Sequence, residues 1–374
     1  MAVVDYAALA RGIFDVSVPL RAGRRVWIES WDHSLDLASR LAWEAWRRGS
    51  HVHLTVRPEE LWLRAVLELP VRSLGAVPPQ AAAALGETNA YIFTLGPRTP
   101  LSWNRIPEER RRAISIWLDT RYDRSAFAER WSVLAKAHRV RMLGIEATLA
   151  TPERASALGL GYQEWRELMF GGCLVDYRSI ARRARSLAAL LSRSDDVEIT
   201  TPHGTAVRFS LGHRPVEVSD GIASQAKAVA GRVTYLPAGA VEVTALEDSA
   251  EGAVVFDAPV LVGSRRVEGL TVRLEGGVVT RFTAKEGKES FRRYLREGTG
   301  DVDRFAFFGL GLNPNLRYGF TQDDKVLGGV TVGLGDNTGK GGRNRASGEW
   351  WASIARATVK IGGRTIMADG KLRL

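Results

Sequence analysis

The chain has 374 residues, of which 45% are hydrophobic and 25% are charged, a composition typical of globular proteins. This length exceeds that of one typical core and predicts two domains. No apolar run approaches the roughly 18 residues that span a bilayer, and the N-terminus lacks a signal pattern, so we expect a cytoplasmic protein. The single cysteine, Cys173, excludes an intramolecular disulfide and predicts a small, buried, apolar side chain.

The formal net charge is +10, and arginine supplies 44 of the 52 basic residues. A basic surface attracts phosphate polymers, so association with nucleic acid or the ribosome is one hypothesis. The alternative is the arginine-rich ion pairing of a thermophilic protein. The densest basic cluster, Glu108–Arg112, begins with two acidic residues and is typical of the first turns of a solvated helix.

Short apolar runs alternate with segments of helical periodicity over the first 190 residues. Alternation of this kind predicts a mostly parallel sheet covered by helices. We therefore predict a Rossmann-like α/β domain over residues 1–190, which ends in a helix at Tyr177–Ser192. The predicted strands are Arg25–Glu29, Gly49–Val56, Tyr91–Leu95 and Arg139–Glu146, and the predicted helices are Leu35–Trp46, Glu59–Leu69, Glu108–Thr120 and Arg124–Ala137.

Residues 191–374 show strand-like alternation interrupted by glycines. Examples are Val197–Thr201 and Leu270–Phe282, and this pattern predicts a β-rich α+β domain with antiparallel hairpins. Glu275-Gly-Gly277 is a predicted hairpin turn, and Lys288–Glu297 is the one helix that we expect in this domain.

The second half also carries four recognisable segments: Leu236–Gly239, Glu247–Gly252, Phe308–Pro314, and Asp324–Gly328 followed by Gly335–Asn337. In order and spacing they resemble the thermophilic metallo-aminopeptidase family of the aminopeptidase T and S type. The resemblance implies the aminopeptidase T fold for the two domains. It also implies a homodimer, because members of the family enclose their active sites in a dimer.

The resemblance implies five metal-ligand positions, and none of them keeps the family's ligand. The family tyrosine that lies further downstream is also missing, since the last tyrosine is Tyr318, and no histidine follows His213. The residues at the five positions are Ala240, Phe307, Thr331, Glu349 and Trp351.

Metallopeptidases need the cation to polarise the scissile carbonyl and to lower the pKa of bound water. From the lost ligands we expect no bound metal, no other cofactor and no catalytic residues. The predicted protein is a pseudoenzyme that binds a peptide, a protein terminus or another macromolecule.

The first rival is an active hydrolase with a remodelled metal site. Glu242 lies two residues after Ala240 and shares its face of a strand, about 7 Å away. With Asp336 and Glu349 it would offer three carboxylates, which suit a hard cation.

A glycine-rich segment, Gly333–Gly341, is similar to a phosphate loop but departs from that motif at Leu334 and Gly341. The family resemblance instead implies a loop that lines the active-site cleft. The residues that we expect to line the cleft are Gly311, Asn313, Asp336 and Asn337.

Two smaller groups in the first domain have structural interpretations. Asp32-His33-Ser34 has the residue types of a catalytic triad, but adjacent residues cannot form its relay, so we expect Asp32 or Ser34 to cap a helix. His51 and His53 share one face of a strand without an evident third metal ligand.

Tryptophans are concentrated in the first half of the chain, with nine of the eleven before residue 166. Trp43 and Trp46 share one face of a predicted helix. Such aromatics are typical of a core and, next, of an interface, so the implied dimer could use them.

Overall fold

The computed structural model describes residues 4–100, 106–114, 125–263 and 265–373. The chain divides into two compact units, Met1–Tyr177 with Gly221–Ala238, and Arg178–Asp220 with Gly239–Leu374. The backbone therefore passes between the units three times. In the part of the chain that is described, no helix combines the length and the apolar character needed to cross a bilayer.

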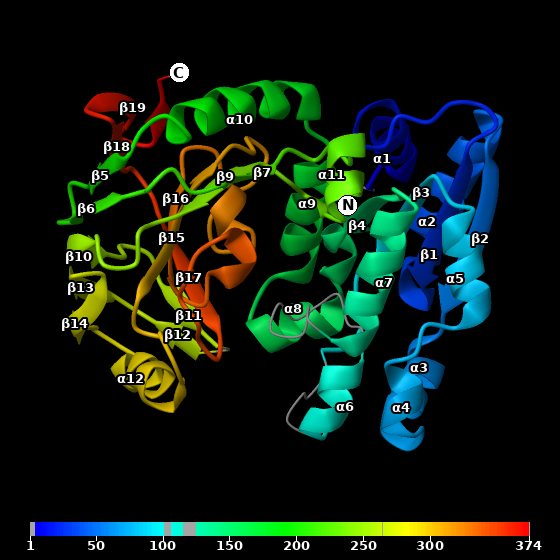
Figure 1. Ribbon diagram of the computed structural model, residues 1–374, viewed down its shortest axis with the longest axis horizontal. Helices are drawn as coiled ribbons and strands as arrows, with labels where there is room; N and C mark the ends of the chain where they lie inside the picture. Colours follow the sequence, from blue (N-terminus) through cyan, green and yellow to red (C-terminus); the bar gives the residue numbers. More distant parts are fainter. Residues whose placement is uncertain (1–3, 101–105, 115–124, 264, 374) are drawn as a thin grey trace. The chain divides into compact units, whose positions relative to one another are not determined.

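The first unit contains a five-stranded parallel sheet in the order β2-β1-β3-β4-β8 (Figure 1). This sheet confirms the predicted α/β fold. Its fifth strand, β8, comes from after residue 220, and the sequence analysis did not assign it to this sheet. The strands are β1 (Arg25–Trp31), β2 (His51–Arg57), β3 (Ala90–Thr94), β4 (Arg141–Ile145) and β8 (Val233–Leu236).

Helices precede, connect and follow these strands. The predicted helix from Glu108 is observed as α6 up to Ala113, and residues 115–124 lie outside the described part. The helices of this unit are α1 (Tyr6–Gly12), η1 (Ile13–Ser17), η2 (Asp32–Ser34), α2 (Leu35–Arg47), α3 (Glu59–Glu68), α4 (Val71–Leu74), α5 (Pro79–Gly86), α6 (Glu108–Ala113), α7 (Ala126–Ala137), η5 (Glu146–Leu149), α8 (Pro152–Leu158), α9 (Tyr162–Cys173) and α11 (Gln225–Ala230).

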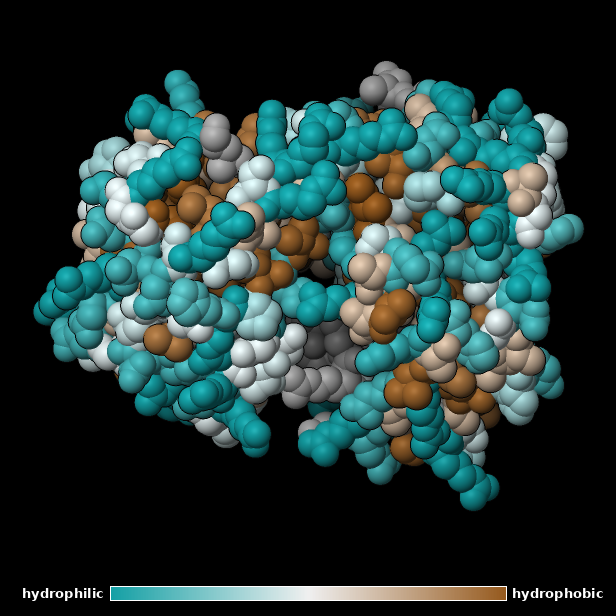
Figure 2. Space-filling model, turned by 45° about the horizontal axis from the view of Figure 1, so that its top comes forward, coloured by the Kyte–Doolittle hydropathy of each residue, from teal (hydrophilic) through white to brown (hydrophobic). Residues whose placement is uncertain are grey.

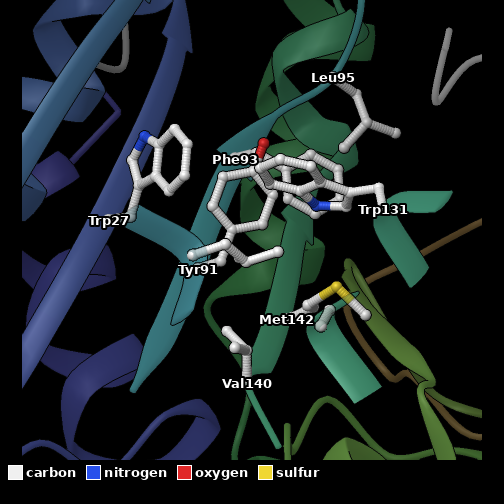
Figure 3. Close-up of a cluster of buried hydrophobic side chains, with 9 residues drawn as sticks. Trp27, Tyr91, Phe93, Leu95, Trp131, Val140 and Met142 are labelled. Atoms are coloured by element: carbon white, nitrogen blue, oxygen red, sulfur yellow. The ribbon is translucent and has the colours of Figure 1, made fainter. Parts of the chain in front are cut away.

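An aromatic cluster joins one face of the parallel sheet to α7 (Figure 3). Tyr91 and Phe93 are two residues apart on β3, so strand geometry places both side chains on the same face of the sheet. The ring of Trp131 from α7 lies 5.4 Å from Tyr91 and 5.5 Å from Trp27 of β1, centroid to centroid. These buried rings fix the helix on the sheet through their large apolar area.

Trp43 and Trp46 lie outside this core. They are 58% and 54% exposed on α2, so the expectation that they belong to a core is wrong, and their part in a dimer stays a prediction. Cys173 is buried, as predicted. On the face drawn in Figure 2, hydrophobic side chains alternate with hydrophilic ones, which is ordinary for a protein surface.

The second unit is built from two larger sheets and one two-stranded ribbon (Figure 1). The eight-stranded sheet has the order β14-β13-β10-β6-β5-β18-β19-β20, the five-stranded sheet has the order β17-β16-β15-β9-β7, and the ribbon is β11-β12. The predicted turn at Gly276 and Gly277 joins β13 to β14 with positive φ angles of 56° and 74°, which glycine adopts without strain.

The elements of this unit agree with the predicted β-rich domain, and helix α12 has the predicted bounds. The helices are α10 (Tyr177–Leu191, which begins at the last residue of the first unit), α12 (Lys288–Glu297), η6 (Asp323–Lys325) and η7 (Thr338–Lys340). The strands are β5 (Asp196–Thr200), β6 (Ala206–Ser210), β7 (Val216–Ser219), β9 (Ala240–Thr244), β10 (Glu251–Val255), β11 (Val260–Val262), β12 (Arg265–Val267), β13 (Thr271–Glu275), β14 (Val278–Thr283), β15 (Phe305–Gly311), β16 (Val330–Gly335), β17 (Glu349–Ile354), β18 (Thr358–Ile361), β19 (Arg364–Ala368) and β20 (Lys371–Leu372).

The core of the second unit lies between its two larger sheets. Phe209 of β6 packs against Phe305 and Phe308 of β15, with ring centroids 4.8 Å and 5.6 Å apart. The strand register is irregular between Phe305 and Phe307, so Phe305 and Phe308 share this face although they are three residues apart. Because neighbouring residues of a strand point to opposite faces, Phe307, next to Phe308, lies on the other face of the five-stranded sheet.

Candidate functional site

The strand register places the five family ligand positions on one face of the five-stranded sheet. Phe307 pairs with Gly333, which pairs with Trp351 on the next strand, and Thr331 lies two residues before Gly333. Directly paired residues share a face, and so do residues two apart. Ala240 belongs to the same face through its partner Gly311, and Glu349 belongs to it as the residue two before Trp351.

Glycines in the central strands make room on this face. A Cβ atom at Gly333 would lie 2.1 Å from the Phe307 ring, and a Cβ atom at Gly309 would lie 3.1 Å from Cγ of Glu242. Glu242 pairs directly with Gly309. The small residues therefore let the Phe307 ring and the Glu242 side chain lie close to the sheet.

A lysine sits between two carboxylates on this face. The Lys340 ammonium, at the end of η7, lies 2.7 Å from Oε1 of Glu349 and 3.2 Å from Oε2 of Glu242. It also lies 3.5 Å from the centroid of the Phe307 ring, within the range of a cation–π contact. We call Glu242, Lys340 and Glu349 the lysine cluster.

The lysine cluster is partly buried, and burial perturbs its ionisation. Burial raises the pKa of Glu349, and the Lys340 ammonium opposes that rise without cancelling it. For Lys340, burial lowers the pKa, but Glu242 and Glu349 outweigh burial and the pKa is raised. The lysine is therefore charged at neutral pH. Glu349 is a carboxylate with a stronger affinity for protons than an ordinary glutamate.

Asp336, the third residue of the predicted remodelled metal site, is engaged in its own loop. Its Oδ1 accepts hydrogen bonds from the backbone N and the hydroxyl of Thr338, and its Oδ2 accepts one from the backbone N of Ala346. The structure therefore brings Glu242 and Glu349 together through Lys340, and it gives Asp336 a role in shaping the loop.

Of the other residues expected to line a cleft, Asn313 and Asn337 have buried side chains and Gly311 has no side chain. Asn313 and Asn337 are 0% and 1% exposed. Asn337 donates a hydrogen bond to the carbonyl of Ala306 and accepts one from the backbone N of Asn344. These amides stabilise turns within the second unit, and their predicted place in a cleft stays a prediction, as does that of Gly311.

Two predictions in the first unit have different outcomes. Ser34 stands at the N-cap position of α2, but its side chain makes no capping hydrogen bond. Asp32 accepts a hydrogen bond from the backbone N of Glu59, the first residue of α3, and so satisfies the start of that helix instead. His51 and His53 are both exposed on β2, and His53 lies with its ring edge-on to Trp27.

Comparison with known proteins identifies the family. The family model described as thermophilic metalloprotease (M29) matches residues 3–303. The chain belongs to the M29 family. The match ends before Phe307, so the last four of the five ligand positions lie outside the matched residues. No curated protein sequence matches the chain.

Two solved structures share the fold. Wild-type AmpT from Thermus thermophilus has a TM-score of 0.63 at 18% identity, covering 99% of each chain. 2,5-Dihydroxypyridine dioxygenase from Pseudomonas putida KT2440 has a TM-score of 0.62 at 15% identity, covering 99% of this chain and 96% of the other. At such identities the similarity establishes the fold, which is the aminopeptidase T fold that the sequence predicted.

These comparisons overturn the prediction of a pseudoenzyme. The chain belongs to a family whose model describes metalloproteases, which are enzymes. The prediction rested on the five missing metal ligands. It assumed that no other side chains on this face of the sheet could catalyse a reaction.

The residues present do not fit the metal ions that the M29 family implies. Ala240, Phe307 and Trp351 carry no ligand atoms suited to a divalent ion. The hydroxyl of Thr331 is hydrogen bonded to that of Ser353 at 2.8 Å, and Glu349 is paired with an ammonium. The Lys340 ammonium thus already occupies the place between Glu242 and Glu349, and a metal ion there would have to displace it.

Proposed function

We propose that this M29-family chain is an aminopeptidase-like hydrolase with a remodelled site, the lysine cluster. One observation carries the proposal: the Lys340 ammonium lies within 3.2 Å of both Glu242 and Glu349, on the sheet face that holds the five family positions. A fixed positive charge can stabilise an oxyanion as a metal ion does, when it is held in place before the reaction.

The cluster can divide the work of amide hydrolysis among its three side chains. The Glu349 carboxylate takes a proton from water, and the resulting hydroxide attacks the carbonyl carbon. The negative charge that develops on the carbonyl oxygen lies beside the Lys340 ammonium. The carbon–nitrogen bond then breaks as Glu349 returns the proton to the leaving amine. Glu242 is a positioning residue, because it holds the lysine from the other side.

A peptide amino terminus is the substrate group that suits this charge pattern. Two carboxylates and one ammonium leave the lysine cluster with a net charge of −1, which attracts the cationic α-amino group of a peptide. The homodimer and the association with nucleic acid or the ribosome stay predictions, and they do not bear on this proposal.

Glu349→Gln is the first test of the proposal. Glutamine keeps the size and the acceptor oxygen but cannot take a proton, so we expect turnover of aminoacyl 4-nitroanilides to fall about 100-fold or more. Glu275→Gln is the matched control, since Glu275 pairs with exposed Arg273 on the other large sheet, and it should leave turnover unchanged. Equal turnover in Glu349→Gln and the wild type would refute the proposal.

The pH profile tests the same residue independently. Because the folded pKa of Glu349 is raised, its carboxylate becomes protonated at a higher pH than an ordinary glutamate. Activity should therefore fall as pH decreases through this raised pKa and be fully present above it. We expect the acid limb of the kcat/KM profile to have an apparent pKa above the usual pKa range of glutamate. A limb within the usual range would rule out Glu349 as the base.

A further inference from the structure

A second group of ligand-type side chains lies in the first unit, at the carboxyl end of its parallel sheet. Asp32 and His33 follow β1 directly, and Glu59 begins α3 shortly after β2. The chain goes from β1 to β2 on one side and then returns to β3 on the other side of β1. Such a reversal of strand order is where open α/β sheets bind ligands.

The three side chains converge. One ligand atom each from Asp32, His33 and Glu59 can be chosen so that all lie within 4.8 Å of one another. Nδ1 of His33 lies 4.0 Å from Oδ1 of Asp32. These separations are wider than those around a bound ion with ligand distances of about 2.0–2.2 Å, so binding requires the side chains to move toward one another.

The histidine is oriented as a metal ligand would be. Its Nε2 lies 3.2 Å from the carbonyl oxygen of Thr148, and because a carbonyl only accepts, Nε2 carries the proton. Nδ1 then carries no proton and presents a lone pair. It is buried without a hydrogen-bond partner among the described residues. A buried, unsatisfied acceptor is rare and calls for an explanation.

Backbone groups hold the two carboxylates in place. Asp32 accepts hydrogen bonds from the backbone N of His33 and of Glu59, at 2.8 Å and 2.9 Å. Glu59 accepts them from the backbone N of Arg98 and Thr99, at 2.8 Å and 3.1 Å. Each oxygen keeps a second lone pair. Outer hydrogen bonds of this kind orient the ligands of metal sites.

The local charge also favours a cation. Asp32 and Glu59 are carboxylates, and the nearby positive charge is Arg154, whose guanidinium donates to the carbonyl of Pro97. Burial lowers the pKa of Arg154 to about 10, so it stays charged at neutral pH. Arg98 pairs with Glu153. The carboxylates of Asp32 and Glu59 carry two negative charges and the Arg154 guanidinium carries one positive charge, so the net charge around the three ligands is negative.

We propose that Asp32, His33 and Glu59 bind one divalent transition-metal ion. One imidazole nitrogen with two carboxylates suits Zn²⁺ or Mn²⁺, whereas Mg²⁺ and Ca²⁺ prefer oxygen ligands alone. Asp32 is about half exposed, so water or a small ligand can complete the coordination. Its three residues belong to the first unit, whereas the residues of the lysine cluster belong to the second.

The test is Zn²⁺ titration of the chelator-treated full chain by calorimetry, followed by Co²⁺ absorption spectroscopy. We expect one ion per chain for the wild type and affinity at least 100-fold weaker in both His33→Gln and Glu59→Gln. His51→Gln, which alters an exposed histidine on β2, is the matched control and should bind normally. Circular dichroism confirms that each variant is folded.

Each outcome decides the proposal. No Zn²⁺ binding by the folded wild type, unchanged affinity in both variants, or equal weakening in His51→Gln would overturn it, as would binding of Mg²⁺ as tight as that of Zn²⁺. Lys340→Met and Glu349→Gln should keep the Zn²⁺ stoichiometry. Failure of this site therefore shows in the titration, and failure of the proposed hydrolase shows in turnover.

Discussion

Lys340→Met is expected to lower kcat for aminoacyl 4-nitroanilides about 100-fold or more. Methionine keeps most of the length of the side chain but removes the ammonium that faces the developing oxyanion. Removal of one preorganised group of this kind costs about 10²–10³ in kcat. The substitution also removes the charge that restrains the pKa of Glu349, so the acid limb of the pH profile should move to higher pH.

Lys360→Met is the matched control for this variant. Lys360 pairs with Glu198 between two strands of the eight-stranded sheet, and both side chains are about half exposed. Exposed pairs contribute little, so kcat and the pH profile should stay as in the wild type. If Lys340→Met kept full turnover, or if its acid limb moved to lower pH, the electrostatic role of Lys340 would be wrong.

Gly311→Ala is expected to lower the free energy of unfolding by about 3 kcal/mol. A Cβ atom at Gly311 would lie 2.0 Å from the carbonyl oxygen of Val326 and 2.7 Å from its carbon. These are backbone atoms, so no side chain can rotate away, and the end of β15 would have to separate from the segment beside it. Denaturant unfolding of the full chain measures the loss.

Gly339→Ala is the control for the glycine substitution. Nothing lies within 4 Å of a Cβ atom at Gly339, and we expect a change within about 0.5 kcal/mol. Similar stability of the two variants would show that the close approach of β15 to Val326 is not a tight packing constraint.

The alternating periodicity of the first 190 residues was enough to predict the parallel sheet, because each strand and helix there is a local pattern. The pairing of β8 with β4 was not predictable in the same way. That strand follows a passage of chain through the second unit, and the short run Val233–Leu236 has no local feature that assigns it to one sheet. Long-range pairing of this kind depends on tertiary packing.

The sequence located the sheet face of the candidate site but not the residue that fills it. Matching the five positions by residue type shows which ligands are missing. Lys340 lies within the glycine-rich segment Gly333–Gly341, which the sequence predicts only as a loop. One signal was available: two glutamates, Glu242 and Glu349, stayed close to the lost positions, and buried carboxylates require a compensating cation. Lys340 lies nine residues before Glu349 in sequence, and only the fold shows that it lies between the two.

The group Asp32, His33 and Glu59 also could not be assembled from the sequence alone. The first two residues are adjacent in sequence, but Glu59 is 27 positions beyond Asp32, and its approach depends on β1 and β2 ending side by side. Periodicity predicted both strands, whereas the orientation of His33 depends on the carbonyl of Thr148, which comes from a third segment of the chain.

The most direct test of the account is kcat/KM for the wild type, Lys340→Met, Glu349→Gln and the double variant on one aminoacyl substrate. Groups that act as one unit give strongly non-additive losses. We predict measurable turnover by the wild type, losses of about 100-fold or more in each single variant, and a double variant hardly slower than the slower single one. Absence of wild-type turnover across a substrate panel, or losses that multiply, would contradict catalysis by the lysine cluster.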